Sequence, residues 1–226
     1  MRLYIVDYPR KSEYAEASPI KTAHDYDRFD YCPECGSRVS GAYWIQPREV
    51  VLTKHKAPDF LYTSCDSAPF VVSERALEAI RAAGLRGLLQ AQEIETVRFQ
   101  RTPKQEKYLP KYYHIEVARS RITIDHEQSV IKYGTRGYGG RKEGPGCPLC
   151  RQVLATYDFC RCLTMKMDEY DGYDIFQTYE MCDTLFLSQR FLDMVKEWEL
   201  TNMYCKPSRT QGEQTWKYFL EGVENA

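Results

Sequence analysis

The sequence has 226 residues, and its 31 Lys and Arg against 32 Asp and Glu give a formal net charge of −1. A chain of this length can bury a core as one large domain or two small ones. The balanced charge argues against a general nucleic-acid or membrane-surface binder. Its apolar runs are shorter than the roughly 18 residues that span a bilayer, and the first residues lack a signal-peptide pattern. We therefore expect a cytoplasmic protein.

The first structural signals along the chain are a strand and a cysteine motif. Residues 3–8 predict a strand that ends at Pro9. "CPECG" at residues 32–36 is followed much later by "CPLC" at residues 147–150, with proline after the first cysteine each time. Nine cysteines without a secretion signal are more typical of metal ligands or redox centres than of disulfides.

Cys32 and Cys147 are 115 residues apart, and this offset also aligns two further blocks without gaps. "DFLYT" aligns with "DIFQT", so that Asp59 matches Asp174, and "FVVSERALEAIRAAGL" aligns with "LFLSQRFLDMVKEWEL". Three blocks in one register predict two diverged repeats, at about residues 30–88 and 145–204. For the matched aspartates we expect roles in turns or caps.

Each repeat has the pattern of a cysteine hairpin, a strand, a capped helix and a further strand. Ser73 and Ser188 occupy N-cap positions, and apolar residues then recur at helical spacing until Gly84 and Asn202. Short apolar runs predict the flanking strands at residues 69–72, 88–91, 184–187 and 203–206.

Aromatic and β-branched residues predict a strand-rich insert over residues 89–132, and a glycine-rich segment at 133–146 predicts a flexible loop. We expect an α+β fold in which residues 1–226 form a single compact domain. Its two related halves would pack about a pseudo-twofold axis.

A CPxC hairpin is typical of a zinc site, because a tight turn presents two thiolates to one ion. A structural zinc takes four ligands, with sulfur at about 2.3 Å. If the halves pack about a pseudo-twofold axis, the two hairpins meet and complete one shared Zn²⁺ site. The ligands of this structural site would be Cys32, Cys35, Cys147 and Cys150.

Other interpretations of the cysteines stay open. "CRC" follows "CPLC" after nine residues, so a local site is possible, although it gives Cys32 and Cys35 no role; its ligands would be Cys147, Cys150, Cys160 and Cys162. A thioredoxin-like dithiol needs a βαβ context that "CPECG" lacks. Buried free thiols suit Cys65, Cys182 and Cys205.

The sequence contains no GxSxG, phosphate-loop or HExxH motif, and none of its four histidines stands beside a catalytic motif. We expect His114 to be a structural residue of a strand. A closed site of four thiolates has no open coordination position for water. The sequence therefore predicts a protein that is not an enzyme.

The cysteine pairs, "DIFQT" and the two strand-plus-helix segments together resemble the double-CxxCG motif family, from about residue 30 to 205. This family resembles bacterial immunity proteins against contact-delivered polymorphic toxins, and is expanded in myxobacteria. The resemblance implies a cytoplasmic, non-enzymatic protein that binds and neutralises a cognate toxin domain encoded by a neighbouring gene. Arg151 departs from the family pattern, which has glycine there; a positive φ at this position would cost roughly 1 kcal/mol.

An acidic segment is the candidate partner-binding surface. Residues 158–183 contain seven acidic and two basic residues; tyrosines provide contact area and carboxylates attract basic partners. The candidate contact residues are Asp168, Glu169, Tyr170, Asp171 and Tyr173. An ordinary solvated acidic loop is the alternative interpretation.

The alternative function is a zinc-containing nucleic-acid-binding or regulatory protein, since "KYGTRGYGGRK" has four basic residues. The neutral chain makes a nucleic-acid partner the weaker expectation.

Overall fold

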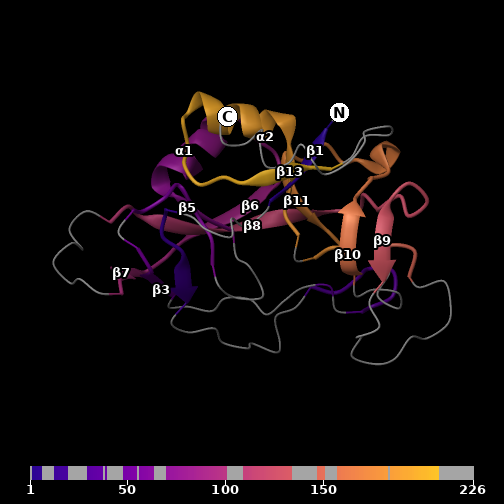
Figure 1. The fold of residues 1–226 in the computed structure, drawn as a ribbon, viewed down its shortest axis with the longest axis horizontal. Helices are drawn as coiled ribbons and strands as arrows, with labels where there is room; N and C mark the ends of the chain where they lie inside the picture. Colours follow the sequence, from indigo (N-terminus) through magenta and orange to yellow (C-terminus); the bar gives the residue numbers. More distant parts are fainter. Residues whose placement is uncertain are drawn as a thin grey trace.

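The fold is that of a computed structural model, in which a mixed β-sheet carries helices α1 and α2 side by side on one face (Figure 1). The structure describes residues 2–6, 13–19, 30–37, 39, 48–54, 56–63, 70–100, 109–133, 147–150, 157–182 and 184–208. The main sheet has the strand order β13-β1-β12-β11-β8-β5-β4, and β6 also pairs with β8. The α+β class expected from the sequence is confirmed.

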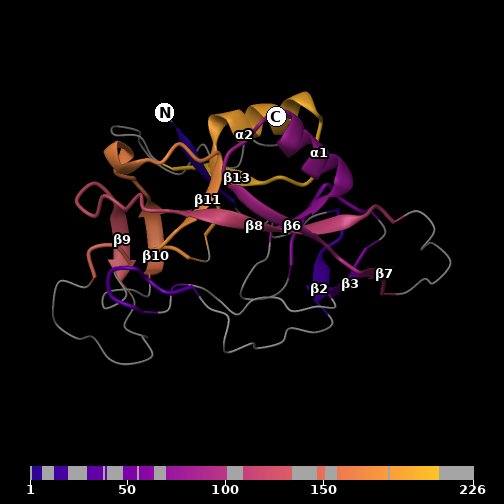
Figure 2. The same cartoon turned by 180° about the vertical axis from the view of Figure 1, so that it is seen from behind.

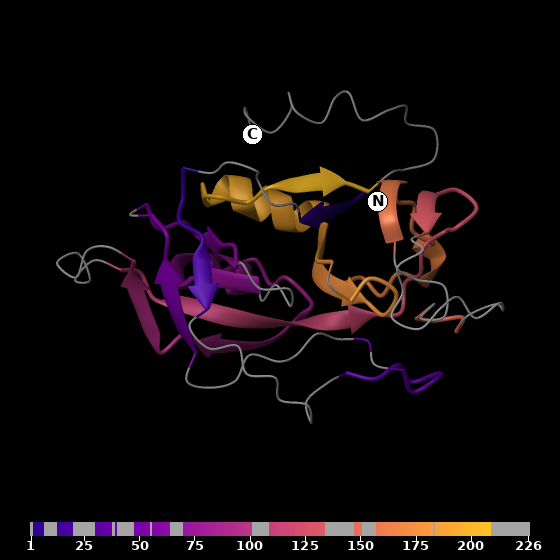
Figure 3. The same ribbon diagram turned by 60° about the horizontal axis from the view of Figure 1, so that its bottom comes forward.

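The main sheet is organised around β8, which is nine residues long and pairs with β5, β6 and β11. Its strands are β1 (Leu3–Val6), β4 (Phe60–Leu61), β5 (Phe70–Ser73), β6 (Leu88–Glu93), β8 (Tyr112–Ser120), β11 (Ile175–Thr178), β12 (Phe186–Ser188) and β13 (Cys205–Pro207). Figure 3 shows β1 and β13 side by side, as their antiparallel pairing requires.

Two smaller sheets lie at opposite ends of the molecule (Figures 1 and 2). One contains β2 (Ala17–Pro19), β3 (Glu49–Leu52) and β7 (Thr96–Phe99). The other contains β9 (Val130–Tyr133) and β10 (Tyr157–Cys162). The flexible loop predicted at 133–146 lies outside the described residues, except for its first residue, which ends β9.

The helices begin where the sequence predicts. α1 (Glu74–Ala82) is capped by the Ser73 hydroxyl, which accepts a hydrogen bond from the Ala76 N–H. α2 (Gln189–Glu197) is capped in the same way by Ser188. Gly84 follows α1 with a φ of +58°, as a C-cap glycine does.

The end of α2 differs from the sequence-based expectation. The helix ends at Glu197, and Glu199 takes the left-handed conformation with a φ of 49°. Asn202, which was expected to end the helix, lies beyond it with a φ of 67°. Trp198 and Leu200 continue the apolar pattern because both pack against the core, although neither lies within the helix.

The principal core lies between the helices and the sheet. The buried side chains of both helices pack with Phe60, Ile175 and Leu187 from three strands. Burial of a large apolar side chain contributes roughly 1.5–3 kcal/mol relative to exposure, so this shared core stabilises both halves of the chain together.

Two buried aspartates connect the halves. Asp59 precedes β4 and accepts hydrogen bonds from the Ser73 hydroxyl (2.8 Å) and from the backbone N–H of Thr201 (2.9 Å). Asp174 precedes β11 and accepts from the Ser188 hydroxyl (2.7 Å) and from the backbone N–H of Arg86 (2.9 Å). We call each aspartate with its donors a carboxylate clamp.

Each carboxylate clamp also includes an arginine from the first turn of a helix. Arg75 contacts Asp59 at 3.4 Å, and Arg190 contacts Asp174 at 3.0 Å. The two arginines also donate to backbone carbonyls at the end of the opposite helix, those of Trp198 and Ala83 respectively. The clamp at Asp59 therefore joins residues near 59–75 to residues near 198–201. The clamp at Asp174 joins residues 174–190 to residues 83–86.

Replacement of either clamp aspartate should destabilise the whole protein. Asp59→Ala and Asp174→Ala each leave a buried hydroxyl and a backbone N–H of the opposite half without an acceptor. We expect each variant to lower the free energy of unfolding by on the order of 3 kcal/mol. Urea denaturation followed by circular dichroism measures this loss.

Asp168→Ala is the matched control for this experiment, because Asp168 is exposed. We expect it to change the free energy of unfolding by less than about 0.5 kcal/mol. If either clamp variant is as stable as this control, the clamps do not hold the halves together.

Candidate metal centre

The four cysteines of the two CxxC motifs lie in one cluster. The Sγ atoms of Cys32 and Cys147 are 3.7 Å apart, and those of Cys35 and Cys150 are 3.5 Å apart. All four Sγ atoms lie within 4.8 Å of one another, and none of the four cysteines is in a disulfide. The structure thus brings together the ligand set that the sequence proposed across the two halves.

The first hairpin is a tight turn with a glycine at the position that needs it. The Gly36 N–H donates to the Cys32 carbonyl, and the Cys32 N–H donates to the Ser37 carbonyl, both at 2.8 Å. Gly36 has a φ of +71°, a conformation that favours glycine. Arg151, the corresponding residue after the second hairpin, lies outside the described residues.

The cluster has the dimensions of a tetrahedral thiolate site. Four sulfurs at about 2.3 Å from a zinc ion are about 3.8 Å from one another, close to the separations of the two sulfur pairs. Thiolates are soft ligands that select Zn²⁺ or another thiophilic metal over Mg²⁺ or Ca²⁺. The donor set therefore fits a four-coordinate metal.

The two thiols of the first hairpin differ in exposure and in acidity. Cys35 is exposed, and the Ser37 hydroxyl and backbone N–H hydrogen-bond to its sulfur and lower its pKa to about 6. Cys32 is buried, and this burial raises its pKa although backbone N–H groups of Cys35 and Glu34 act in the opposite direction. Cys35 thus ionises more readily at neutral pH than Cys32 does.

Arg119 and Arg121, at the end of β8, hold the first hairpin against the main sheet. Arg119 donates to the Val39 carbonyl at 2.8 Å and to the Asp30 carboxylate at 2.6 Å, which flank the hairpin. Arg121 donates to the carboxylate of Glu34 at 2.6 Å. The sequence did not identify either arginine, because no residue pattern distinguishes them from the other basic residues.

The apolar surroundings of the cluster exclude water from three of its four sulfurs. Val39 and Leu149 are buried beside Cys32, Cys147 and Cys150, and Tyr179 packs against them. The guanidinium of Arg119 lies over the Tyr179 ring at 5.6 Å. The cysteine cluster is thereby attached to the segment that follows β11.

The other cysteines lie outside this cluster. Cys182 and Cys205 are half-buried and are not in a disulfide, and burial raises the pKa of Cys205 to about 11. Cys160 and Cys162 belong to β10, but their side chains are outside the described part of the structure, as is Cys65. The local alternative that uses Cys160 and Cys162 therefore stays a hypothesis.

The histidines with described surroundings have structural contacts. Burial, together with the charge of Arg48, lowers the pKa of His114 to about 4, which keeps its ring neutral at pH 7. His126 hydrogen-bonds to buried Glu180, whose other oxygen accepts from the Ile124 N–H at 2.9 Å. His114 lies on β8, as the sequence predicted.

The predicted partner-binding residues form a loop that is bonded to the end of β8. This loop begins with the short helix η2 (Met167–Glu169). Glu169 accepts from the N–H and the hydroxyl of Thr123, and Asp171 accepts from the hydroxyl of Ser120 and the N–H of Arg121.

The two tyrosines of the loop are partly buried. Tyr170 donates to the Tyr173 carbonyl, and its ring packs 5.9 Å from that of Phe176. The Tyr173 ring lies under the Arg86 guanidinium at 5.7 Å. Of the five predicted contact residues, Asp168, Glu169 and Asp171 are the exposed ones.

Comparison with known proteins identifies the family. None of the helices in the described part of the chain has the length and apolarity of a bilayer span, and no curated protein matches the sequence significantly. The sequence profile of an immunity protein family, Imm11, matches residues 36–209. That range includes two of the four clustered cysteines, Cys147 and Cys150, and both carboxylate clamps. The resemblance to immunity proteins is thereby confirmed, and the chain belongs to the immunity protein family Imm11.

Proposed function

We propose that this protein binds a cognate polymorphic toxin domain and neutralises it without catalysis, and that one structural zinc ion stabilises the fold. Membership of an immunity protein family carries the first part of this proposal. The toxin domain would be encoded by a neighbouring gene and met in the cytoplasm, where reducing conditions keep cysteines as thiols.

The cysteine cluster supports a structural metal. Its ligands would be Cys32, Cys35, Cys147 and Cys150, whose Sγ atoms lie within 4.8 Å of one another. A zinc ion held by four thiolates has no position left for a substrate or an activated water. Its contribution would be to join two hairpins that are more than a hundred residues apart in the chain.

We also propose that the two halves are diverged repeats of one domain, packed about a pseudo-twofold axis. The hydrogen bonds of the clamps support this, because the serine hydroxyl, backbone N–H and arginine bonds to one aspartate each have a counterpart 115 residues along the chain. The bonds Ser73–Asp59 and Ser188–Asp174 form one such pair, and Thr201–Asp59 and Arg86–Asp174 form another. Helices α1 and α2 begin and end at the same offset.

The loop of residues 168–173 is our proposed contact with the toxin. Its hydrogen bonds to residues 120–123 hold the loop in place before binding, which reduces the entropy that association costs. Asp168 is exposed next to Met167, whose exposed fraction of 38% is high for a large apolar side chain. A basic toxin surface would meet carboxylates at the rim of the contact.

Metal content tests the zinc site. We expect one equivalent of zinc in the purified protein, and its loss in both Cys32→Ser and Cys147→Ser, because each variant removes one ligand from a different hairpin. Inductively coupled plasma mass spectrometry measures the metal. Cys205→Ser, which changes a thiol outside the cluster, should retain it.

The same variants should have a lower melting temperature and a partly retained helical signal, since α1 and α2 have their own caps and core contacts. A full equivalent of zinc in Cys32→Ser would contradict the shared site. Loss in Cys160→Ser together with retention in Cys32→Ser would support the local site instead.

Thiol reactivity tests the electrostatics of the cluster. In the metal-free protein, iodoacetamide should modify Cys35 first, because it is exposed and has a pKa of about 6. Since the thiolate is the reactive form, the rate should rise from pH 5 to pH 7 and then level off. An ordinary cysteine is only half ionised at a pH equal to its pKa of about 8.5 and still gains reactivity above it. Peptide mass spectrometry identifies the modified residue.

Two comparisons complete this experiment. Ser37→Ala should move the midpoint of the Cys35 profile to higher pH, because the hydroxyl donor is removed. Bound zinc should protect all four cysteines. A midpoint above pH 8 in the unmodified sequence would show that Ser37 does not stabilise the thiolate.

Complex formation tests the immunity function. With the toxin domain encoded by the neighbouring gene, Asp168→Lys should slow association several-fold at low salt and leave dissociation nearly unchanged, because rim charges act on encounter rates. Surface plasmon resonance separates the two rates. Co-expression with the toxin measures protection of the cell.

Glu127→Lys is the matched control, since Glu127 is also an exposed acidic residue and lies in a turn beyond β8. Equal association rates for the two variants would place the interface away from residues 168–173. Absence of any complex with the neighbouring gene product would refute the proposed function itself.

A further inference from the structure

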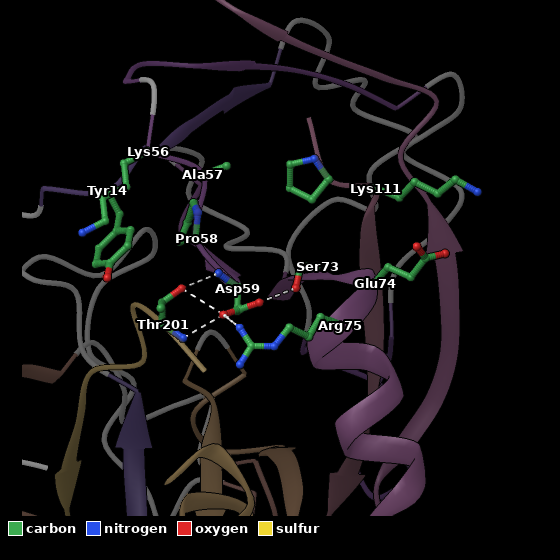
Figure 4. Close-up of a pocket in the computed structure, with 11 residues that line it drawn as sticks. Tyr14, Lys56, Ala57, Pro58, Asp59, Ser73, Glu74, Arg75, Lys111 and Thr201 are labelled. Atoms are coloured by element: carbon green, nitrogen blue, oxygen red, sulfur yellow. Dashed lines mark hydrogen bonds and ion pairs between the residues drawn. The ribbon is translucent and has the colours of Figure 1, made fainter. Parts of the chain in front are cut away.

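A partly open cavity of about 440 Å³ lies beside Asp59, between the first turn of α1 and residues 56–58 (Figure 4). Ala57, Pro58, Pro110 and the ring of Tyr14 provide its apolar walls. None of these residues belongs to the cysteine cluster or to the proposed contact loop at residues 168–173.

The polar groups at the inner end of this cavity are already bonded to one another. The Asp59 carboxylate accepts from the hydroxyls of Ser73 and Thr201, at 2.8 Å and 3.0 Å. Figure 4 shows these side chains converging on Asp59 together with Arg75. A ligand would therefore gain little from hydrogen bonds at the inner end and most from contact with the walls.

The charged side chains around the cavity also have partners within the protein. Lys56 pairs with Glu13 and lies over the Tyr14 ring at 4.2 Å. Arg75 pairs with Asp59, and Glu74 accepts from the Tyr113 hydroxyl at 3.4 Å. Together with exposed Lys111, these groups leave the cavity without a strong preference for either sign of charge.

Two residues that line this cavity have larger counterparts in the clamp at Asp174. At the offset of 115 residues, Pro58 corresponds to Tyr173, and Thr201 corresponds to Arg86. Beside Asp174, Tyr173 lies under the Arg86 guanidinium, which also donates to the Asp171 carbonyl at 3.3 Å. Beside Asp59, the corresponding positions hold Pro58 and Thr201, which are smaller.

We propose that the cavity beside Asp59 binds a tyrosine or phenylalanine side chain presented by a protein partner. The cavity has apolar walls, including two prolines, and the ammonium group of Lys111 at its edge can contact the face of a ring. The ring that Tyr173 supplies at Asp174 is absent at Asp59, so an external ring can take that place. Aromatic side chains that fill such pockets are frequent anchors of protein interfaces.

This site is separate from the proposed contact at residues 168–173, and the proposal does not require the partner to be a toxin. It can therefore be tested with small peptides on the full-length protein. If no peptide binds, the proposed immunity function is not affected. If no toxin complex forms, the proposed role of the cavity is not affected.

The probe is the tripeptide acetyl-Gly-Tyr-Gly-amide, titrated into ¹⁵N-labelled protein up to about 10 mM, a range suited to the weak affinity of one side chain. Saturable shifts of the backbone amides of Ala57, Arg75 and Thr201 are expected. The matched peptide acetyl-Gly-Leu-Gly-amide should bind at least fivefold more weakly. Shifts that do not saturate, that are equal for both peptides, or that lie elsewhere would overturn the proposal.

Filling the cavity gives the second test. Pro58→Tyr places a tyrosine at the position that corresponds to Tyr173, so that the new ring fills the cavity. It should weaken tyrosine-peptide binding at least tenfold. Ala57→Leu narrows the same cavity with a smaller change and serves if Pro58→Tyr does not fold. Glu127→Gln, at an exposed position, is the control and should bind normally. Undiminished binding in a folded cavity variant would overturn the assignment.

Discussion

The structure depends on two buried carboxylates whose hydrogen bonds cannot be completed within one half of the chain. Asp59 takes a hydroxyl donor from its own half, at Ser73, but a backbone N–H from Thr201 in the other. Asp174 takes the reverse combination, from Ser188 and Arg86. A buried carboxylate without its donors is costly, so neither half can bury its aspartate until the other half is in place. The clamps thus make folding of the two halves one event.

The cysteine cluster depends on this arrangement through β8. The clamps precede β4 and β11; β4 pairs with β5, and β5 and β11 both pair with β8. The far end of β8 then positions the first hairpin, because Arg119 bonds to residues on both sides of it and Arg121 bonds within it. Four sulfurs can approach within 4.8 Å only if both hairpins are held in this way. The sheet thus already holds the two hairpins close to the arrangement of sulfurs that a bound metal would need.

The sequence predicted features that depend on side-chain identity. Ser73 and Ser188 cap helices, and the four cysteines cluster, because each role needs a particular side-chain atom. The clamp partners of the aspartates were not predictable, since Thr201 and Arg86 donate through backbone N–H groups that any residue other than proline has. For the same reason, Asp59 and Asp174 were expected only in turns or caps.

Other differences have physical causes of the same kind. The sheet of β2, β3 and β7 was not predicted, because β2 is short and the pairing of β3 with β7 joins segments distant in the chain. The end of α2 was placed too late, because Leu200 continues the helical apolar pattern and is buried, yet lies beyond the helix. In both cases, contacts between distant parts of the chain determine where the element forms or ends, and the local sequence pattern does not.

The position of the cysteine cluster explains why one ion would serve both halves. A residue near a twofold axis contacts its own counterpart, and Cys32 and Cys35 each lie within 3.7 Å or less of the cysteine 115 residues away. In the proposed pseudo-twofold arrangement, the ion would therefore lie on the axis, where each half contributes only two ligands. Two ligands are too few for a structural zinc, so neither hairpin could hold the metal alone. If the halves are diverged repeats, as we propose, their other residues can differ widely, as Pro58 and Tyr173 do, while both cysteine pairs would still be needed to hold the ion.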